Sequence, residues 1–200
     1  MKQPEHIRDR LYPNSSAETP DPKRRRFLRL GIAALAAASL PRQTFAASPS
    51  AVQAERALAF YNTHTGERLK TTYWEQGQYI GEALSWIDHL LRDHLANETR
   101  EIEPKLLDLL YAIRSQMNSR EPFHVISGYR SNNTNAYLRA HSSGVADNSL
   151  HTVGKAIDIR LPGRDLRSLR KAALDLKSGG VGFYPKSDFI HVDIGSVRYW

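Results

Sequence analysis

Two short apolar segments toward the carboxyl end of the sequence each combine a histidine with a carboxylate. In Ser-Leu-His-Thr-Val-Gly-Lys-Ala-Ile-Asp, His151 precedes Asp158 by seven positions. In Phe-Ile-His-Val-Asp-Ile, His191 precedes Asp193 by two positions. A carboxylate inside an apolar strand is costly to bury unless it is paired or coordinates a metal. Because both segments place polar ligand types among apolar residues, we expect them to share one site.

The residue types in these segments suit metal-assisted hydrolysis. Two imidazoles and a carboxylate, with a fourth position left for water, form the ligand set of a catalytic zinc ion. Zinc lowers the pKa of bound water toward about 7 and polarises a carbonyl group, so hydroxide becomes available at neutral pH. The alternative is a buried histidine and aspartate that hydrogen-bond to each other without metal. The spacing alone leaves both interpretations open.

Three features in this order along the chain resemble the zinc D-Ala-D-Ala peptidases and their hedgehog-fold relatives. The segment 127–131, Ser-Gly-Tyr-Arg-Ser, matches the S-G-Y-R-S segment of that group, and the segment 149–158 matches its pattern S-x-H-x-x-G-x-A-x-D. His191, in a late predicted strand, matches the third metal ligand. The chain after residue 46, up to Trp200, is also similar to the murein endopeptidase K family. This resemblance implies periplasmic cleavage of peptide cross-links in peptidoglycan.

The resemblance also implies roles for individual residues. The zinc ligands would be His151, Asp158 and His191. Arg130 corresponds to the arginine that sits by the scissile carbonyl, where a fixed cation stabilises the developing oxyanion. A structural ion pair is the alternative role for Arg130. Ser127 and Tyr129 are candidates for substrate contact, and Ser127 could instead hold a ligand by a hydrogen bond or cap a turn.

Two carboxylates compete for the role of general base. The carboxypeptidase members of the group have an acidic residue three positions before the third ligand, and that position is Asp188 here. Side chains alternate along a strand, so Asp188 and His191 would lie on opposite faces unless a bulge or the strand start intervenes. Asp193 shares the face of His191. We therefore prefer Asp193, either as the base or as a carboxylate that orients a ligand.

The elements predicted around these residues are of mixed type. Strand patterns cover 57–62 and 68–74 around a Thr-Gly turn signal, then 123–127, 155–161, 181–184 and 189–194. Helical periodicity covers 79–94, 104–118, 134–141 and 166–177. His124 falls in a predicted strand, where we expect a half-buried, hydrogen-bonded imidazole. The order of elements predicts an α+β fold with a mainly antiparallel central sheet and helices packed against it, and the resemblance implies its hedgehog or DD-peptidase type.

Length and composition fit one domain with an amino-terminal tail. The chain has 200 residues, 40% hydrophobic and 24% charged, which are globular values, and no cysteine, which excludes disulfides and thiol chemistry. The net charge of +7 would suit a nucleic-acid binder. Residues 1–46 hold nine basic and four acidic side chains, whereas the remainder holds 19 basic and 17 acidic ones. Nucleic-acid binding is therefore not predicted for the domain.

The segment 1–46 has the anatomy of an export signal. Arg-Arg-Arg-Phe-Leu-Arg, starting at Arg24, opens onto an alanine-rich apolar run of eleven residues that ends at Leu40, and Thr-Phe-Ala before residue 47 offers a cleavage site. The paired arginines resemble the twin-arginine signal, whose machinery moves folded proteins across the bacterial inner membrane. The run is too short for a hydrocarbon core that needs about 20 residues. An uncleaved interfacial anchor is the alternative.

These observations predict three segments: an export signal (1–46), a linker (47–56) and a zinc peptidase domain (57–200). The resemblance to the murein endopeptidase K family implies a periplasmic, Zn²⁺-dependent murein endopeptidase and favours diaminopimelate-diaminopimelate (3-3) links as the bond that is cut. Its predicted partners are peptidoglycan stem peptides and the twin-arginine machinery, with no nucleic acid and no stable membrane span after cleavage. Alternatives are a D-Ala-diaminopimelate endopeptidase, a D,D-carboxypeptidase and, in another class, a non-catalytic peptidoglycan-binding module.

Overall fold

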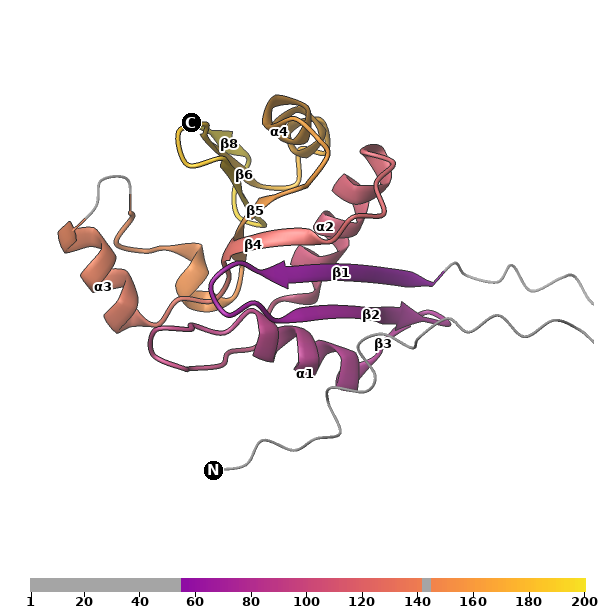
Figure 1. Ribbon diagram of the computed structural model, residues 1–200, viewed down its shortest axis with the longest axis horizontal. Coiled ribbons are helices and arrows are strands. Elements are labelled where there is room, and N and C mark those ends of the chain that lie inside the picture. Colours follow the sequence, from indigo (N-terminus) through magenta and orange to yellow (C-terminus); the bar gives the residue numbers. More distant parts are fainter. Residues whose placement is uncertain (1–54, 142–144) are drawn as a thin grey trace, which may run out of the picture. The chain divides into compact units, whose positions relative to one another are not determined.

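The computed structural model describes residues 55–141 and 145–200 (Figure 1). The predicted export signal (1–46) and nearly all of the predicted linker (47–56) lie outside the described residues. The described part is an α+β fold in which helices pack against one central sheet, as the order of elements predicts. Within it, no helix is both long and apolar enough to cross a bilayer.

Eight strands form the sheet in the order β3-β2-β1-β4-β5-β7-β6-β8. Their bounds are β1 Arg56–Asn62, β2 Arg68–Glu75, β3 Gln78–Tyr79, β4 Phe123–Ser127, β5 Ala156–Arg160, β6 Gly180–Tyr184, β7 Phe189–Asp193 and β8 Arg198–Tyr199. Neighbouring strands are antiparallel except for the parallel pairs β1/β4 and β6/β8, which confirms a mainly antiparallel sheet. The predicted strands are all present. β3 and β8 were not predicted, because two residues are too few for an alternating pattern.

Four α-helices and one 3-10 helix accompany the sheet. Their bounds are α1 Gly81–Leu90, α2 Pro104–Gln116, α3 Asn132–His141, η2 Leu150–Val153 and α4 Leu166–Asp175. The helices predicted at 104–118, 134–141 and 166–177 are confirmed to within two residues at each end. Proline occupies the first turn of α2, where its missing N–H costs no hydrogen bond.

The first helix is shorter than its apolar periodicity predicts, because α1 ends at Leu90 rather than at residue 94. The carbonyl of Leu91 accepts a hydrogen bond from the backbone N–H of Tyr129 (2.7 Å) instead of continuing the helix. The carboxylate of Asp93 then accepts from the N–H groups of Leu95 (3.0 Å) and Ala96 (3.2 Å). A short acidic side chain that binds nearby N–H groups competes with helical hydrogen bonding. The chain therefore turns there toward the segment 127–131.

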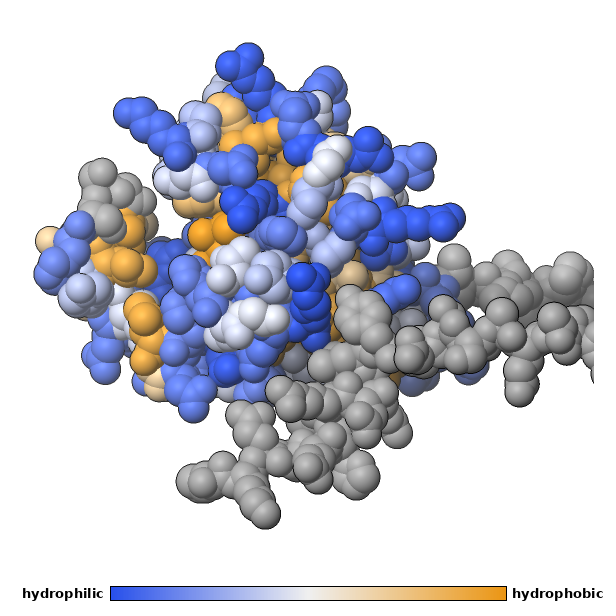
Figure 2. All heavy atoms as spheres, in the orientation of Figure 1, coloured by the Kyte–Doolittle hydropathy of each residue, from blue (hydrophilic) through white to orange (hydrophobic). Residues whose placement is uncertain are grey.

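One face of the sheet packs against α1, α2 and α4 and forms the hydrophobic core. In β5, Ile157 and Ile159 lie in this core, so the intervening Asp158 points to the opposite face, which we call the outer face. In β7, His191 likewise points outward between two core residues. Alternation along the neighbouring strands β5 and β7 therefore places two of the predicted ligands, Asp158 and His191, on the same face. Figure 2, in the orientation of Figure 1, shows mostly hydrophilic side chains with smaller apolar areas among them.

Candidate metal centre

Two of the predicted metal ligands are direct neighbours across the sheet. Asp158 on β5 is the cross-strand partner of His191 on β7, and Ser127 on β4 is the partner of Asp158 on its other side. Gly182 on β6 continues this line as the partner of His191. Side chains of paired residues in adjacent strands stand about 5 Å apart on one face. Strand register thus brings residues 33 positions apart in sequence into contact.

The third predicted ligand, His151, is delivered by η2. The side chain of Ser149 caps this short helix by accepting from the backbone N–H of His151 (3.4 Å). Gly154 ends the helix with a left-handed backbone (φ 67°), and a Cβ added there would lie 2.2 Å from the carbonyl oxygen of Glu101. Only glycine fits such a close approach. The serine and glycine of the pattern S-x-H-x-x-G therefore shape the turn that aims the histidine.

The side chains of the three predicted ligands form a small buried triangle. His151 Nε2 lies 3.1 Å from His191 Nδ1 and 3.3 Å from Asp158 Oδ1, and His191 Nδ1 lies 2.9 Å from Asp158 Oδ1. Tetrahedral ligand atoms at about 2.0–2.1 Å from zinc stand about 3.3 Å from one another. The side chains are 3–11% exposed. This donor set has the size and chemistry that a small divalent cation requires. Among the described residues, these three side chains form the group that could hold a metal ion.

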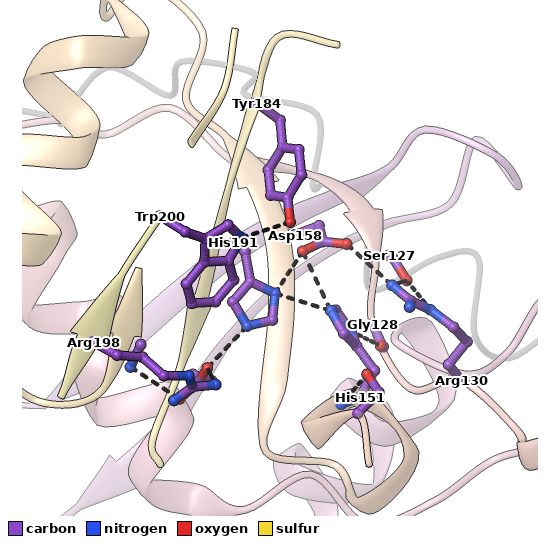
Figure 3. A network of polar contacts seen from close by, with 12 residues as sticks. Ser127, Gly128, Arg130, His151, Asp158, Tyr184, His191, Arg198 and Trp200 are labelled. Carbon is purple, nitrogen blue, oxygen red and sulfur yellow. Dashed lines mark hydrogen bonds and ion pairs between the residues drawn. The ribbon is translucent and has the colours of Figure 1, made fainter. Parts of the chain in front are cut away.

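Hydrogen bonds on the far side of each ring orient both imidazoles (Figure 3). His151 Nδ1 lies 2.8 Å from the carbonyl oxygen of Gly128, and His191 Nε2 lies 3.0 Å from Asp193 Oδ2. Both acceptors are oxygens, so each of these ring nitrogens carries the proton. The remaining nitrogens, His151 Nε2 and His191 Nδ1, then present lone pairs to the centre of the triangle. Such outward contacts with a carbonyl or carboxylate are the usual support of metal-binding histidines.

The charges of the cluster favour a cation at its centre. Burial alone would raise the pKa of Asp158, but His151 and His191 beside it hold that pKa far below its usual range. Burial lowers the pKa of His151. Burial also opposes charge on His191, yet hydrogen bonds with Asp158 and Asp193 raise its pKa above the ordinary value. Metal binding requires the neutral imidazole, so a cation at the centre of the triangle would compete with a second proton on His191 Nδ1.

Arg130 is joined to the cluster through Asp158. Its Nη2 donates to Asp158 Oδ2 (3.2 Å) and to Ser127 Oγ (3.1 Å), and Nε also donates to Ser127 (3.3 Å). The Arg130 side chain is 10% exposed, and burial lowers the pKa of its guanidinium while Asp158 opposes that effect. The ion pair given above as the alternative role of Arg130 is therefore present. Arg130 holds Oδ2 of Asp158 and leaves Oδ1 facing the two imidazoles.

The other residues of the segment 127–131 have different surroundings. Ser127 supports the guanidinium of Arg130, which places its hydroxyl beside the cluster. The ring of Tyr129 is partly buried against the hydrophobic core, and its backbone N–H donates to Leu91. Ser131 donates its N–H to the buried carboxylate of Asp93 (2.8 Å). The segment is thus anchored on both sides of Arg130.

The structure separates the two candidate bases. Asp193 is fully buried and accepts hydrogen bonds from the N–H groups of Gly180 (2.9 Å) and Gly195 (2.8 Å) and from Arg198 Nη2 (2.7 Å), besides contacting His191. Burial would raise the pKa of Asp193, but these donors and His191 lower it strongly. Asp188 has a left-handed backbone (φ 53°) before β7. Its side chain is 65% exposed and pairs with Arg160 at 3.3 Å. Asp193, and not Asp188, belongs to the network around the triangle.

A tryptophan and a tyrosine that received no role in the sequence analysis complete one wall of the site. The indole of Trp200 packs near His191, with ring centroids 5.3 Å apart, and its Nε1 donates to the hydroxyl of Tyr184 (2.8 Å). Gly182 makes room for this ring, because a Cβ there would lie 2.7 Å from Trp200 Cε2. The only sequence signal was the resemblance at Trp200. Contacts between β6 and the end of β8 carry no local pattern.

Comparisons with known proteins agree on one family. A family model described as peptidoglycan L,D-endopeptidase MepK matches residues 50–200. A protein of Escherichia coli (strain K12) named peptidoglycan L,D-endopeptidase MepK is 44% identical over 180 residues, which cover 90% of this chain and 98% of that protein. A Shigella flexneri protein of the same name gives the same values. A probable peptidoglycan L,D-endopeptidase MepK of Haemophilus influenzae is 40% identical over 183 residues, 90% of this chain and 96% of that protein.

Proposed function

The chain belongs to the peptidoglycan L,D-endopeptidase MepK family, and on this premise we propose that it is a zinc-dependent endopeptidase that hydrolyses peptide cross-links of peptidoglycan. The family makes the chain a peptidoglycan hydrolase, and the metallopeptidase class fits that family. One observation carries the metal-dependent chemistry. The donor atoms of His151, Asp158 and His191 converge within 3.3 Å of one another, with both imidazoles oriented by outward hydrogen bonds.

We propose that the bond cut is the diaminopimelate-diaminopimelate (3-3) link. The relatives are named L,D-endopeptidases. A 3-3 link joins the carbonyl of an L-centre to the amine of a D-centre, whereas a D-Ala-diaminopimelate link joins two D-centres. The name of the relatives therefore supports the first bond over the second. A terminal D-Ala trimmed by a carboxypeptidase is also attached through an amide, so the same metal centre would serve each reaction.

The proposed mechanism assigns a separate task to each residue around the metal. Bound zinc would supply a water of low pKa and polarise the scissile carbonyl. His151 Nε2, His191 Nδ1 and Asp158 Oδ1 would hold the ion. Arg130 would keep Asp158 in place and stabilise negative charge that develops on the carbonyl oxygen, because a buried, fixed cation acts more strongly than one in water. Asp193 would orient His191, since its oxygens already accept several hydrogen bonds.

Asp188 is tested separately as the proton acceptor. Its exposure and its ion pair with Arg160 lead us to expect that Asp188→Asn keeps kcat within about twofold of the wild type, whereas loss of a general base costs about 10²–10⁴-fold. A fall of that size, with bound metal unchanged, would instead identify Asp188 as the base. The measurement is the steady-state cleavage rate of a purified cross-linked muropeptide.

The deciding experiment combines metal analysis with a panel of defined substrates. The purified protein and a His151→Ala variant are analysed for bound metal and incubated with muropeptides that contain 3-3 links, D-Ala-diaminopimelate links or a terminal D-Ala. We expect about one zinc per chain and cleavage of the 3-3 link, both lost in the variant. Metal without cleavage of any substrate would favour a peptidoglycan-binding module. Protein that binds no zinc would refute the ligand assignment.

We also propose that residues 1–46 direct export of the folded protein to the periplasm by the twin-arginine route, followed by the linker 47–56 and the peptidase domain 57–200. The support is the sequence pattern beginning at Arg24. The test is cell fractionation of the wild type and of a variant in which Arg24 and Arg25 are both lysine. The variant should stay in the cytoplasm at full length, and the periplasmic wild-type protein should begin near Ala47.

A further inference from the structure

A second line of side chains crosses the outer face of the sheet beside the metal centre. We call it the transverse row, and it has one member on each of six adjacent strands: Arg68 on β2, Tyr61 on β1, His124 on β4, Arg160 on β5, Phe189 on β7 and Tyr184 on β6. At one end of the row Arg68 is the cross-strand partner of Tyr61, and at the other end Phe189 is the partner of Tyr184. In the middle, Ile159 pairs with Ile190, so the next positions, Arg160 and Phe189, are also adjacent.

The transverse row lies on the same face as the metal ligands. Arg160 follows Asp158 by two residues and Phe189 precedes His191 by two, so each shares the ligand's face. Two residues of a strand span about 6.8 Å. Six strands about 4.8 Å apart make the row about 24 Å long, which equals about seven residues of extended peptide. The row is thus long enough to hold a stem peptide that runs across the sheet beside the metal centre.

The members of the row present flat rings and guanidinium groups to the solvent. The Arg68 guanidinium lies 4.2 Å from the centre of the Tyr61 ring, and the rings of Phe189 and Tyr184 stack at 4.6 Å. Tyr61 meets His124 edge-on at 4.9 Å. Each of these side chains is partly exposed or exposed. Aromatic rings of this kind offer apolar area for alkyl segments of a peptide, while the arginines offer charge.

Of the six side chains in the row, the two arginines carry charge, because His124 favours its neutral form. Burial lowers the pKa of His124, and the nearby Arg160 and Arg68 lower it further. Its Nδ1 is buried without a hydrogen-bond partner, contrary to the hydrogen-bonded imidazole expected from the sequence. A neutral ring suits a half-buried position between two cations. The charge of the row is therefore positive and concentrated at Arg68 and Arg160.

Arg160 already binds a carboxylate, that of Asp188, on this face. Its Nη1 lies 3.3 Å from Asp188 Oδ2, with side chains 39% and 65% exposed. A solvent-exposed pair of this kind is weak, because its attraction is screened by water and it costs side-chain entropy. A carboxylate of a bound peptide, held by further contacts along the row, can therefore replace Asp188. The internal ion pair shows which chemical group this position of the sheet recognises.

Tyr184 joins the row to the metal centre. Its hydroxyl accepts a hydrogen bond from Trp200 Nε1, and Trp200 packs near His191. Figure 3 shows the phenol hydroxyl of Tyr184 joined to the indole of Trp200 beside His191. Tyr184 also interacts electrostatically with Arg130. Tyr184 and Trp200 thus connect the transverse row with His191.

We propose that the transverse row binds one of the two stem peptides of the cross-link, with Arg160 and Arg68 holding its free carboxylates and the aromatic rings packing against its alkyl segments. This inference rests on the proposed function for the identity of the ligand. A cross-link extends to both sides of the scissile bond, so an endopeptidase has to accommodate a second peptide beyond the metal. Stem peptides are anionic through free carboxylates, which complement the charge of the row.

The test compares a double variant, Arg68→Gln with Arg160→Gln, with the wild type on two substrates. One is a cross-linked muropeptide with free carboxylates, and the other is the same molecule with those carboxylates converted to carboxamides. We expect the variant to raise KM for the free acid about tenfold and to leave kcat within about twofold, with little change for the carboxamide. The matched control is Lys171→Gln, which removes a cation from α4, paired with Asp175 on the helix surface. Circular dichroism checks the fold of each protein.

A binding measurement separates this inference from the proposed function. His151→Ala is used as the background, with and without the two arginine substitutions, and the free acid is titrated into each protein by calorimetry. If the wild type cleaves no cross-link but the arginine substitutions still weaken binding about tenfold, the row binds peptide and the proposed function fails. If the wild type cleaves and the substitutions leave Kd and KM unchanged, or weaken acid and carboxamide equally, the transverse row does not recognise carboxylates and the inference is wrong.

Discussion

Replacing Asp193 by asparagine isolates the contribution of one hydrogen bond to metal binding. The carboxylate accepts from Gly180 and Gly195 through Oδ1 and from Arg198 through both oxygens, while Oδ2 faces His191 Nε2. Asparagine retains one oxygen of similar size at the same place. If that oxygen stays with the two backbone N–H groups, the new NH₂ group faces the ring N–H of His191. Two donors then oppose each other.

The imidazole relieves this conflict by moving its proton to Nδ1. Nδ1 is the atom that faces Asp158 and His151, so the proton would occupy the position of the metal-binding lone pair. Loss of such an outer carboxylate costs about 10–100-fold in metal affinity. The variant also weakens charge-assisted hydrogen bonds to Arg198 in a fully buried place, which lowers the free energy of unfolding by about 1–3 kcal/mol.

Metal affinity is measured by competition with a chromophoric zinc chelator, and the ring tautomer by ¹⁵N NMR of the metal-free protein. The control is Asp175→Asn, which removes an exposed carboxylate paired with Lys171 on α4 and should change neither quantity. An Asp193→Asn protein that is folded, keeps the proton of His191 on Nε2 and binds zinc as tightly as the wild type would refute the reasoning.

Three further predictions follow from the same contacts. Removal of metal by a chelator should abolish cleavage, and zinc should restore it, as followed by muropeptide chromatography; activity that persists in protein shown to be metal-free would contradict the ligand assignment. Gly182→Ala should lower the free energy of unfolding by about 1–3 kcal/mol and reduce activity, because the new Cβ lies 2.7 Å from Trp200 Cε2. Gly81→Ala, with no atom within 4 Å of the added Cβ, is its control, and equal effects of both would exclude a role for the indole contact. Burial opposes the charge of Asp93, but hydrogen bonds from Thr134 and Ser131 lower its pKa below the unfolded value. The stability from Asp93 is therefore full above about pH 4 and lost as pH falls through the folded-state pKa. In denaturant titrations, Asp93→Asn should be less stable at pH 7 and lose less stability than the wild type below pH 4; parallel pH curves would refute this.

The sequence contained enough information to predict which polar residues meet, because strand alternation is a local rule. It placed Asp158 and His191 in apolar strands. The alternation of side chains along the second strand favoured Asp193 over Asp188 as the neighbour of His191. The hairpin, three helices and the antiparallel sheet followed from the same periodicities. These features depend on residues a few positions apart.

Contacts made across the sheet could not be predicted in the same way. The wall formed by Tyr184 and Trp200 depends on the small β8 strand and on the space above Gly182. The early end of α1 depends on a carbonyl that binds Tyr129, a residue outside the helix. The pairing of Arg130 with Asp158 also required the register of β4 against β5. In each case the deciding partner is distant in sequence.

The position of β7 between β5 and β6 links metal binding to the order of folding. β6 precedes β7 in the chain, yet β7 lies between β5 and β6 in the sheet, so β5 and β6 are joined only through β7. His191, the last of the three ligands to be synthesised, arrives on this inserted strand, whereas His151 and Asp158 come from the preceding turn and strand. The complete triangle of His151, Asp158 and His191 therefore exists only after β7 has paired with β5. Bound zinc would hold β7 to β5 and to the turn before it, and would raise the free energy of unfolding because only the folded sheet presents all three ligands.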